Sequence, residues 1–510
     1  MALAVDLGQR GATCAVVERH ITPQLIPKGQ NLTQRTLEHF YFWNCVEELR
    51  AARFLPPGYP IGGVTAYGNL MSDFWYTDSG RAPAPDFYFQ LNERLPQYQT
   101  EAVLRARVKD LPSVTTMFGW NAQSFAQTDN GVSVRIQQDG WPYEDETIEG
   151  QFLVACDGAR SSIRETLSID RSGADFDQKM LLAVFRSKEL HEGLNRFPER
   201  TTYRVLKPEL QGYWQFFGRV DVGEGWFFHA PVPRDATPES YDFLGLLHEA
   251  AGFNFSAEFD HVGFWELRIM VAEQYRHGRV FIAGDAAHSH PPYGGFGLNN
   301  GLEDVTNLGW KLTAALKGWG GEALLDSYGL ERRPIFVETG EAMIAGGIEK
   351  DRAFLNRHNP ENDGPEWPQR WQEFEAESKS RRMSYEPHYE GSPVVDGPPN
   401  GVCSIYGRHT FAAQAGHHLA PLPLSTGRNV FEELGPDFTL LAFGAEESHV
   451  AALKAAANNV PVKVVPDTQA GGREKYEAKL VLVRPDQYVA WAGNAPPPEA
   501  ATLFRKLAGR

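Results

Sequence analysis

The sequence predicts an α/β protein with three parts: a nucleotide-binding domain, an antiparallel sheet and a smaller α/β domain at the C-terminal end. Three patterns support this prediction. They are a strand, acidic turn, glycine-rich loop and helix at residues 279–312, alternating strand-like segments at 174–270, and a βαβ-ββ order at 438–491. The 510 residues suffice for two or three domains.

The composition argues against several kinds of partner. A net charge of −16 disfavours nucleic acid or an anionic membrane. No apolar run approaches the roughly 20 residues of a spanning helix, and no segment resembles a signal peptide, so we expect a cytoplasmic protein. The four cysteines form no C-x-x-C pair, so we expect free thiols and no metal site.

The first residues are predicted to form the second half of a Rossmann-like βαβ unit. Residues 2–10 have a helical pattern, and residues 13–17 form an apolar strand that ends in Glu18 and Arg19. An acidic residue at this strand end commonly binds the ribose of a dinucleotide, which suits Glu18. An exposed glutamate without a ligand is the plainer alternative.

The strand and the G-x-G-x-x-G loop that should precede this helix are absent from the sequence. We therefore expect a nucleotide-binding domain that lacks its first strand and glycine loop. We also expect that the chain as given starts at an internal methionine, and that it retains a dinucleotide weakly or not at all. Backbone groups of the neighbouring strands should then lack partners.

Two later turns extend the predicted nucleotide site. Asp157 follows one buried strand, and Arg164 can supply charge-assisted hydrogen bonds nearby. Gly284 and Asp285 follow another buried strand. Because ligands of open α/β sheets bind at the carboxyl ends of the strands, we expect both turns to face one site.

A glycine-rich loop then leads into a helix. The loop contains Pro292, Gly295 and Gly297, and the helical pattern begins near Asn299, directly after Leu298. Helix N-termini present free N–H groups and partial positive charge, so this one should hold an anionic or electron-rich group. An ordinary strand-loop-helix connection is the alternative.

Aromatic residues crowd the alternating strands of residues 174–270. Most should belong to the core, because aromatic residues favour strands, but alternation leaves some of them facing a ligand. A pocket of apolar groups with a few polar anchors suits an aromatic ring. Tyr213 and His229 are polar candidates on these strands, and His290 precedes the glycine-rich loop.

These segments resemble the single-component FAD-dependent aromatic hydroxylases, the group with phenol hydroxylase and p-hydroxybenzoate hydroxylase. Two runs carry most of the resemblance: D-G-A-R-S-S-I-R at residues 157–164, and the glycine-rich stretch at residues 284–308. The segment R-T-L-E from Arg35 and the spacing Q-x-x-x-E-x-x-L from Gln97 are also similar to the family.

The resemblance implies FAD as the cofactor, NAD(P)H as the co-substrate, and dioxygen and a small aromatic molecule as partners. Hydroxylation would proceed through a flavin C4a-hydroperoxide, with Pro292 beside the flavin on the substrate side. A phenol also needs a base or proton path, for which His290, His229 and Tyr213 are candidates. The expected cofactor-binding residues are Glu18, Arg19, Arg35, Gln97, Asp157, Arg164, Gly284, Asp285, Pro292, Gly295, Gly297, Leu298 and Asn299.

The C-terminal part resembles the thioredoxin-like domain of the phenol hydroxylase-like branch, through its strand order and the string L-V-R-P-D-Q-Y-V-A-W at residues 482–491. Without C-x-x-C it cannot perform thiol redox chemistry, so we expect a structural role or support of a homodimer. The predicted divisions are residues 1–170 and 271–386 for the FAD-binding domain, 171–270 for the substrate sheet, 387–401 for a linker and 402–510 for the thioredoxin-like domain.

The sequence thus predicts an FAD-dependent monooxygenase that hydroxylates a phenolic or other electron-rich aromatic substrate. One alternative is a flavin monooxygenase that acts on a polyketide-type or other non-phenolic substrate, by epoxidation or a Baeyer–Villiger reaction. Another is a non-catalytic remnant that cannot hold FAD, because the phosphate-binding loop is missing.

Overall fold

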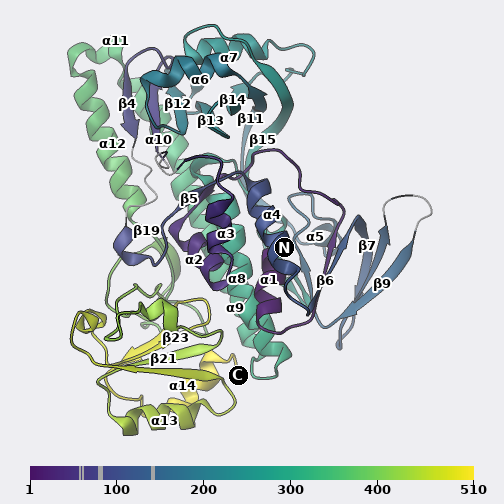
Figure 1. The fold of residues 1–510 in the computed structure, drawn as a ribbon, viewed down its shortest axis with the longest axis vertical. Helices are drawn as coiled ribbons and strands as arrows, with labels where there is room; N and C mark the ends of the chain where they lie inside the picture. Colours follow the sequence, from purple (N-terminus) through teal and green to yellow (C-terminus); the bar gives the residue numbers. More distant parts are fainter. Residues whose placement is uncertain (57–58, 60–61, 78–83, 139, 141–143) are drawn as a thin grey trace.

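The computed structural model describes the chain except residues 57–58, 60–61, 78–83, 139 and 141–143. Figure 1 shows the antiparallel sheet with its helices at one end of the long axis, the C-terminal domain at the other, and long helices between them. The four cysteines are free thiols, as expected. In the described part of the chain, no helix is both long enough and apolar enough to cross a membrane.

The nucleotide-binding domain contains two separate small sheets. In one, β1 (Cys14–Glu18) pairs in parallel with β6 (Val114–Phe118). In the other, β17 (Val280–Ile282) lies between β10 (Leu153–Ala155) and β16 (Arg276–His277). Among the described residues, no strand pairs with the second edge of β1 or of β10. The observed elements agree with the expected mixed α/β fold of this domain.

A three-stranded antiparallel sheet extends from this domain to one side of the molecule (Figure 1). It consists of β7 (Trp120–Gln127), β8 (Val132–Gln138) and β9 (Asp145–Gly150). Its buried side chains alternate along β8, as expected for a sheet with one covered face.

Helix α8 (Phe296–Leu316) is the centre of the molecule. It packs against α1 (Ala2–Gln9) and α9 (Glu322–Glu338), and most of its residues are buried. The approach of α1 is so close that a Cβ atom on Gly309 would lie 2.2 Å from the carboxylate of Asp6. A glycine at position 309 therefore lets α1 pack directly against the central helix.

The substrate region is an eight-stranded sheet with the order β18-β15-β11-β14-β13-β12-β3-β4. Six of these strands are long or central: β11 (Arg171–Arg186), β15 (Glu258–Ala272), β14 (Gly225–Val232), β13 (Gln215–Arg219), β12 (Thr202–Leu206) and β3 (Gly63–Tyr67). The edges are β4 (Phe74–Thr77) and β18 (His288–Ser289). The sheet thus takes strands from before and after residues 171–270.

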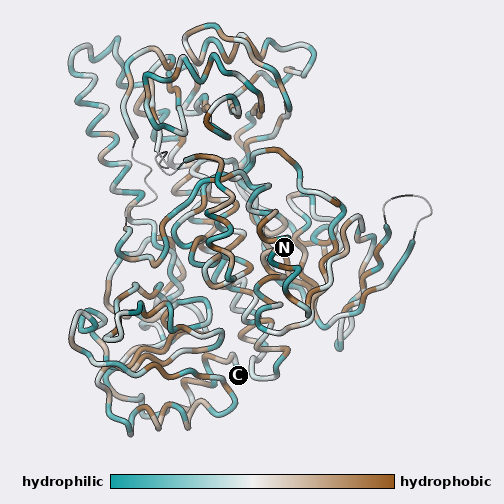
Figure 2. Tube along the Cα trace, in the orientation of Figure 1, coloured by the Kyte–Doolittle hydropathy of each residue, from teal (hydrophilic) through white to brown (hydrophobic). Residues whose placement is uncertain are grey.

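One face of this sheet is covered by α6 (Lys188–Gly193) and α7 (Phe243–Ala251), as Figure 1 shows. Buried residues from the strands and from α7 form one apolar cluster there. The other face turns toward α8, α10 (Gly346–Arg357) and α12 (Trp367–Met383). Figure 2 shows that α12 is mainly hydrophilic, whereas hydrophobic segments run along the central helices.

The C-terminal domain has a four-stranded sheet with the order β22-β21-β23-β24. Its chain order is β21 (Phe438–Phe443), α13 (Glu447–Ala457), β22 (Val462–Asp467), β23 (Leu480–Val483), β24 (Val489–Gly493) and α14 (Ala500–Leu507). Strands β21 and β22 are parallel and the other neighbours antiparallel, as in the expected thioredoxin-like arrangement.

The predicted linker at residues 387–401 lies inside an ordered hairpin-like element. Strand β19 (Tyr385–Tyr389) pairs antiparallel with β20 (Cys403–Tyr406) across it. Within the segment, Ser392 donates a hydrogen bond to buried Glu331 on α9. The segment is therefore fixed to the central helices.

Candidate active site

A cavity of about 1370 Å³ lies between the N-terminal ends of α1 and α8, the open face of the eight-stranded sheet, and helices α10 and α12. Most of the predicted site residues meet there. Those that line it are Glu18, Arg35, Gln97, His229, Gly284, Asp285, His290, Pro292, Gly295, Gly297, Leu298 and Asn299. Arg19, Asp157, Arg164 and Tyr213 do not line it.

The Gly284–Asp285 turn is held from behind by a buried carboxylate. Asp304, on α8, accepts hydrogen bonds from the Gly284 N–H at 3.1 Å and from His288 Nε2 at 2.6 Å. Arg332 adds a salt bridge to Asp304 at 2.8 Å. The side chain of Asp285 lines the cavity. Desolvation by the protein walls around it raises the pKa of its carboxyl.

Helix α8 presents its N-terminus to the cavity. It begins at Phe296, three residues before the predicted start, because Gly294 and Gly295 adopt positive φ angles of 68° and 65° and redirect the chain. No side chain caps this N-terminus. Its first N–H groups are therefore available to an electron-rich ligand group.

The side chain of Asn299 fixes this helix start rather than pointing at a ligand. Its Oδ1 accepts hydrogen bonds from the Thr33 N–H at 2.9 Å and from Thr36 Oγ1 at 2.6 Å. Its Nδ2 donates to the carbonyl oxygens of Asn31 and Gly295. The amide thereby joins α8 to the loop before α2 (Gln34–Phe42).

The D-G-A-R-S-S-I-R run braces the two cofactor turns against each other. Arg164 is buried and donates to the carbonyl oxygens of Ala286 and Ala159, at 2.9 and 3.2 Å. Asp157 accepts a hydrogen bond from the Ile163 N–H. Gly158 lines the cavity with a φ of 83°, and a Cβ atom there would meet nothing within 4 Å.

The arginine expected near the cofactor has its guanidinium occupied by protein groups. Arg35 donates to Glu303, to Glu38 and to the C-terminal domain through the Asp486 carbonyl and the Gln487 side chain. It lines the cavity, but these contacts make it an anchor between domains.

Three further predicted residues lie toward the N-terminal side. Glu18 ends β1 at the cavity, and its Oε1 accepts the His20 N–H at 2.7 Å. The exposed Arg19 donates to the His20 ring instead. Gln97 begins α4 (Gln97–Val108) and lies beside Gly29. A Cβ atom added to Gly29 would lie 3.3 Å from Oε1 of Gln97.

The two histidine candidates line the cavity as neutral rings. His229 Nδ1 donates to the Leu181 carbonyl at 3.2 Å, and burial lowers its pKa to about 4. His290 Nδ1 donates to the Pro291 carbonyl at 2.6 Å, and burial lowers its pKa to about 4 as well. Nε2 of His290 is buried without a partner among the described residues. The third candidate, Tyr213, packs against Arg352 outside the cavity.

Several cavity residues come from segments for which the sequence predicted no site. Asp351 on α10 faces Arg204 of β12 at 3.6 Å, and burial raises the pKa of its carboxyl. Phe374 and Arg382 of α12 also line the cavity. Their helical segments showed no chemical pattern, whereas Asp304 lay within the family-like run and could have been found there.

The residues present fit FAD at its flavin end. An uncapped helix N-terminus suits the electron-rich edge of a flavin, and the carboxylate of Asp285 suits a ribityl hydroxyl. The open space over Gly158 allows close approach of a ligand. At the other end, Met1, Ala2 and Leu3 of the uncapped α1 line the cavity together with Glu18.

Comparisons with known proteins agree with this geometry. The family model described as FAD binding domain matches residues 1–341, and the model described as aromatic-ring hydroxylase, C-terminal, matches residues 412–510. The 4-methyl-5-nitrocatechol 5-monooxygenase of Burkholderia sp is 28% identical, with 98% of this chain and 94% of the relative covered.

Two further similarities extend over the whole chain. Tetracenomycin A2 monooxygenase-dioxygenase of Streptomyces glaucescens is 28% identical, over 100% of this chain and 94% of the relative. The rebeccamycin biosynthetic enzyme RebC, in a structure with reduced flavin, is 27% identical with a TM-score of 0.84, over 100% of this chain and 96% of RebC. The chain therefore belongs to the single-component FAD-dependent aromatic hydroxylases and is an FAD-dependent monooxygenase.

Proposed function

We propose that this monooxygenase hydroxylates a phenolic or other electron-rich aromatic ring bound against the open face of the eight-stranded sheet. The observation that carries the proposal is a neutral histidine set in an aromatic wall. The ring of His229 lies 5.7 Å from that of Phe227 and 5.9 Å from that of Trp265, measured between centroids. All three line the cavity.

His229 is oriented to accept a proton from the substrate. Its Nδ1–H is held by the Leu181 carbonyl, which leaves the lone pair on Nε2. Nε2 has no hydrogen-bond partner among the described residues, so a phenolic hydroxyl can donate to it. A phenol that shares its proton in this way gains electron density on the ring.

The other residues hold the reactants in place. FAD supplies the oxygen-activating chemistry when it is bound. The N-terminus of α8 would stabilise negative charge at the flavin edge, and Asp285 would accept a hydrogen bond from a ribityl hydroxyl. Pro292 lines the cavity and would lie beside the flavin on the substrate side, while Phe227 and Trp265 would exclude water from the ring.

The test uses flavin-loaded protein and a panel of phenols. We expect at least one phenol to stimulate NAD(P)H oxidation and to give a product one oxygen atom heavier, labelled by ¹⁸O₂. A His229→Gln variant should retain flavin but lose most of this hydroxylation. If no phenol stimulates oxidation or becomes labelled, the phenolic substrate is wrong. A folded, colourless protein that FAD cannot reconstitute would instead identify a non-catalytic remnant.

A polyketide-type substrate is the second candidate. The cavity volume of about 1370 Å³ and the similarity to a tetracenomycin A2 monooxygenase-dioxygenase favour it. Polycyclic substrates that stimulate NAD(P)H oxidation when simple phenols do not would decide for this candidate. Mass spectrometry of the product would then separate hydroxylation from epoxidation or Baeyer–Villiger insertion.

The free thiols suit a reducing compartment, so we infer a cytoplasmic location. We also infer that the C-terminal domain supports a homodimer. Fractionation of the source cells and light scattering on the purified protein test these two points.

A further inference from the structure

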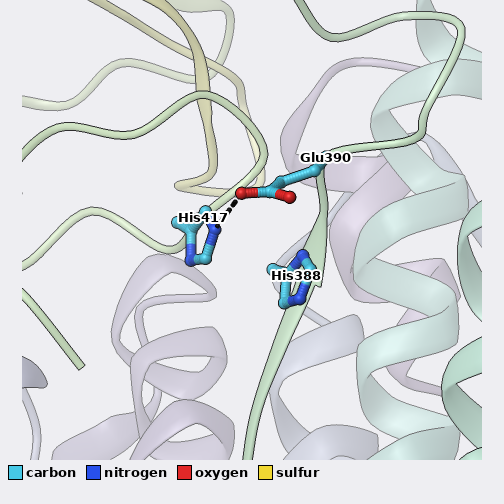
Figure 3. Close-up of side chains that lie close together, drawn as sticks. All are labelled: His388, Glu390 and His417. Atoms are coloured by element: carbon cyan, nitrogen blue, oxygen red, sulfur yellow. Dashed lines mark hydrogen bonds and ion pairs between the residues drawn. The ribbon is translucent and has the colours of Figure 1, made fainter. Parts of the chain in front are cut away.

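Two histidines and a glutamate from different segments converge where the C-terminal domain joins the rest of the chain. His388 and Glu390 lie at the end of β19, and His417 comes from the loop that faces them (Figure 3). One ligand atom from each lies within 4.8 Å of the others. None of the three lines the active-site cavity.

His417 is held between two carboxylates. Its Nδ1 lies 3.1 Å from Glu386 Oε1. Its Nε2 lies 3.0 Å from Glu390 Oε1, the contact that Figure 3 marks with a dashed line. If Nδ1–H donates to Glu386, then Nε2 carries a lone pair that faces a second acceptor. The lone pair of His417 Nε2 and the carboxylate oxygen of Glu390 are both acceptors, and they lie 3.0 Å apart. They need a cation between them, which is either a proton or a metal ion.

His388 offers a second lone pair in the same place. Its Nε2 lies 3.2 Å from the Tyr406 carbonyl oxygen, which can only accept, so Nε2 carries the hydrogen. The lone pair is then on Nδ1, which is buried without a partner among the described residues. The side chain is only 5% exposed, so water does not readily satisfy this nitrogen.

We propose that His388, Glu390 and His417 bind a divalent transition-metal ion of the Zn²⁺ type. The ligand atoms are His388 Nδ1, Glu390 Oε1 and His417 Nε2. Two imidazoles and one carboxylate are a common ligand set for this ion. Glu386 orients His417 through Nδ1, and the Tyr406 carbonyl orients His388 in the same manner, as outer carboxylates and carbonyls do in metal sites.

The site needs a small rearrangement to close around an ion. Zinc–ligand distances are about 2.0–2.2 Å, so the ligand atoms must approach one another more closely than 4.8 Å. The two imidazole rings now stack with centroids 4.6 Å apart and planes 7° from parallel. Glu390 is the most exposed ligand, with 27% of its side chain accessible, so its side leaves room for a water as the fourth ligand.

A metal here would join two segments that meet at the domain boundary. The Tyr389 N–H already donates to the Gly416 carbonyl at 2.7 Å, beside the three ligands. A bound ion would add a cross-link at this point and stabilise the docking of the C-terminal domain. It would not touch the flavin, so metal binding and flavin content can be measured separately.

The test measures zinc binding to the full chain without a polyhistidine tag. After treatment with a chelator, the protein is dialysed against Zn²⁺, and bound metal is counted by mass spectrometry. We expect about one zinc per chain and a higher thermal midpoint. His388→Gln and Glu390→Gln should abolish both effects. Glu386→Gln should weaken binding by about 10–100-fold while the fold is kept, because it removes only the residue that orients His417.

The matched control is His449→Gln, a partly exposed histidine of α13 that lies far from the cluster in the sequence and pairs with Glu446. It should bind zinc like the wild type. Wild-type protein without stoichiometric zinc would overturn the proposal and leave a protonated His417 between its two carboxylates. Zinc binding that persists undiminished in both His388→Gln and Glu390→Gln would also overturn it. Circular dichroism and flavin content show whether each variant is folded.

Discussion

Replacing Glu331 with glutamine should weaken the joint between the central helices and the C-terminal domain. Its carboxylate accepts hydrogen bonds from Arg484 at 2.7 and 2.9 Å and from Lys311 at 2.6 Å. All three side chains are completely buried. Asp486, also buried, forms the second salt bridge with Arg484 at 2.6 Å.

The magnitude follows from the charge balance of this cluster. The two cations, Arg484 and Lys311, are matched by the two anions, Glu331 and Asp486. Glu331→Gln leaves one unmatched buried positive charge, which costs about 3–5 kcal/mol. Burial already lowers the pKa of Lys311 to about 8, and loss of Glu331 lowers it further. Lys311 can then release its proton, so the cost should shrink as the pH rises from 7 to 9.

Urea unfolding followed by circular dichroism measures the loss, and limited proteolysis reports release of the C-terminal domain. The control is Glu373→Gln, which removes one partner of an exposed pair with Arg370 and should cost about 0–1 kcal/mol. If Glu331→Gln lies within about 1 kcal/mol of the wild type, the cluster does not hold the domains together as argued.

Three further predictions concern the active site. His229→Gln should lower the hydroxylation rate by about 10²–10⁴-fold at unchanged flavin content, and an unchanged rate would exclude His229 as proton acceptor. Asp285→Ala should weaken FAD by about 10–100-fold, measured by flavin fluorescence; equal affinity would count against a ribityl contact. His229 and His290 have pKa values lowered to about 4, so the unfolded chain binds protons first as the pH falls. The free energy of unfolding should therefore decrease from about pH 6.5 to pH 4, and less so in a His229→Gln, His290→Gln variant.

The elements of the cofactor site could be predicted from the sequence because each is local. A buried strand, an acidic turn and a glycine-rich loop are specified by neighbouring residues, and the structure brings Asp285 and Gly295 together at the cavity. The start of α8 was predicted three residues too late. Its true start depends on the positive φ angles of Gly294 and Gly295, which helical periodicity does not show.

The side of the cavity formed by the eight-stranded sheet and by α10 could not be predicted, because it depends on packing between segments that are distant in the sequence. Strand β3 pairs in parallel with β12, although about 140 residues separate them, and so extends the substrate sheet. Asp351 faces Arg204 only because α10 packs across the open side of that sheet. Neither segment carries a local pattern that indicates a site.

The contacts of Arg35 explain why the C-terminal domain belongs to the flavin site although it supplies little of its surface. Arg35 bonds at once to Glu303 on α8 and to Asp486 and Gln487 of the C-terminal domain. About one and two turns further along α8, Asn307 and Trp310 donate to the Asp486 carboxylate. The helix whose N-terminus faces the cavity is thus fixed along its length by one turn of the thioredoxin-like domain. That turn is buried, and through it the domain holds α8 in place by contacts that need no thiol chemistry.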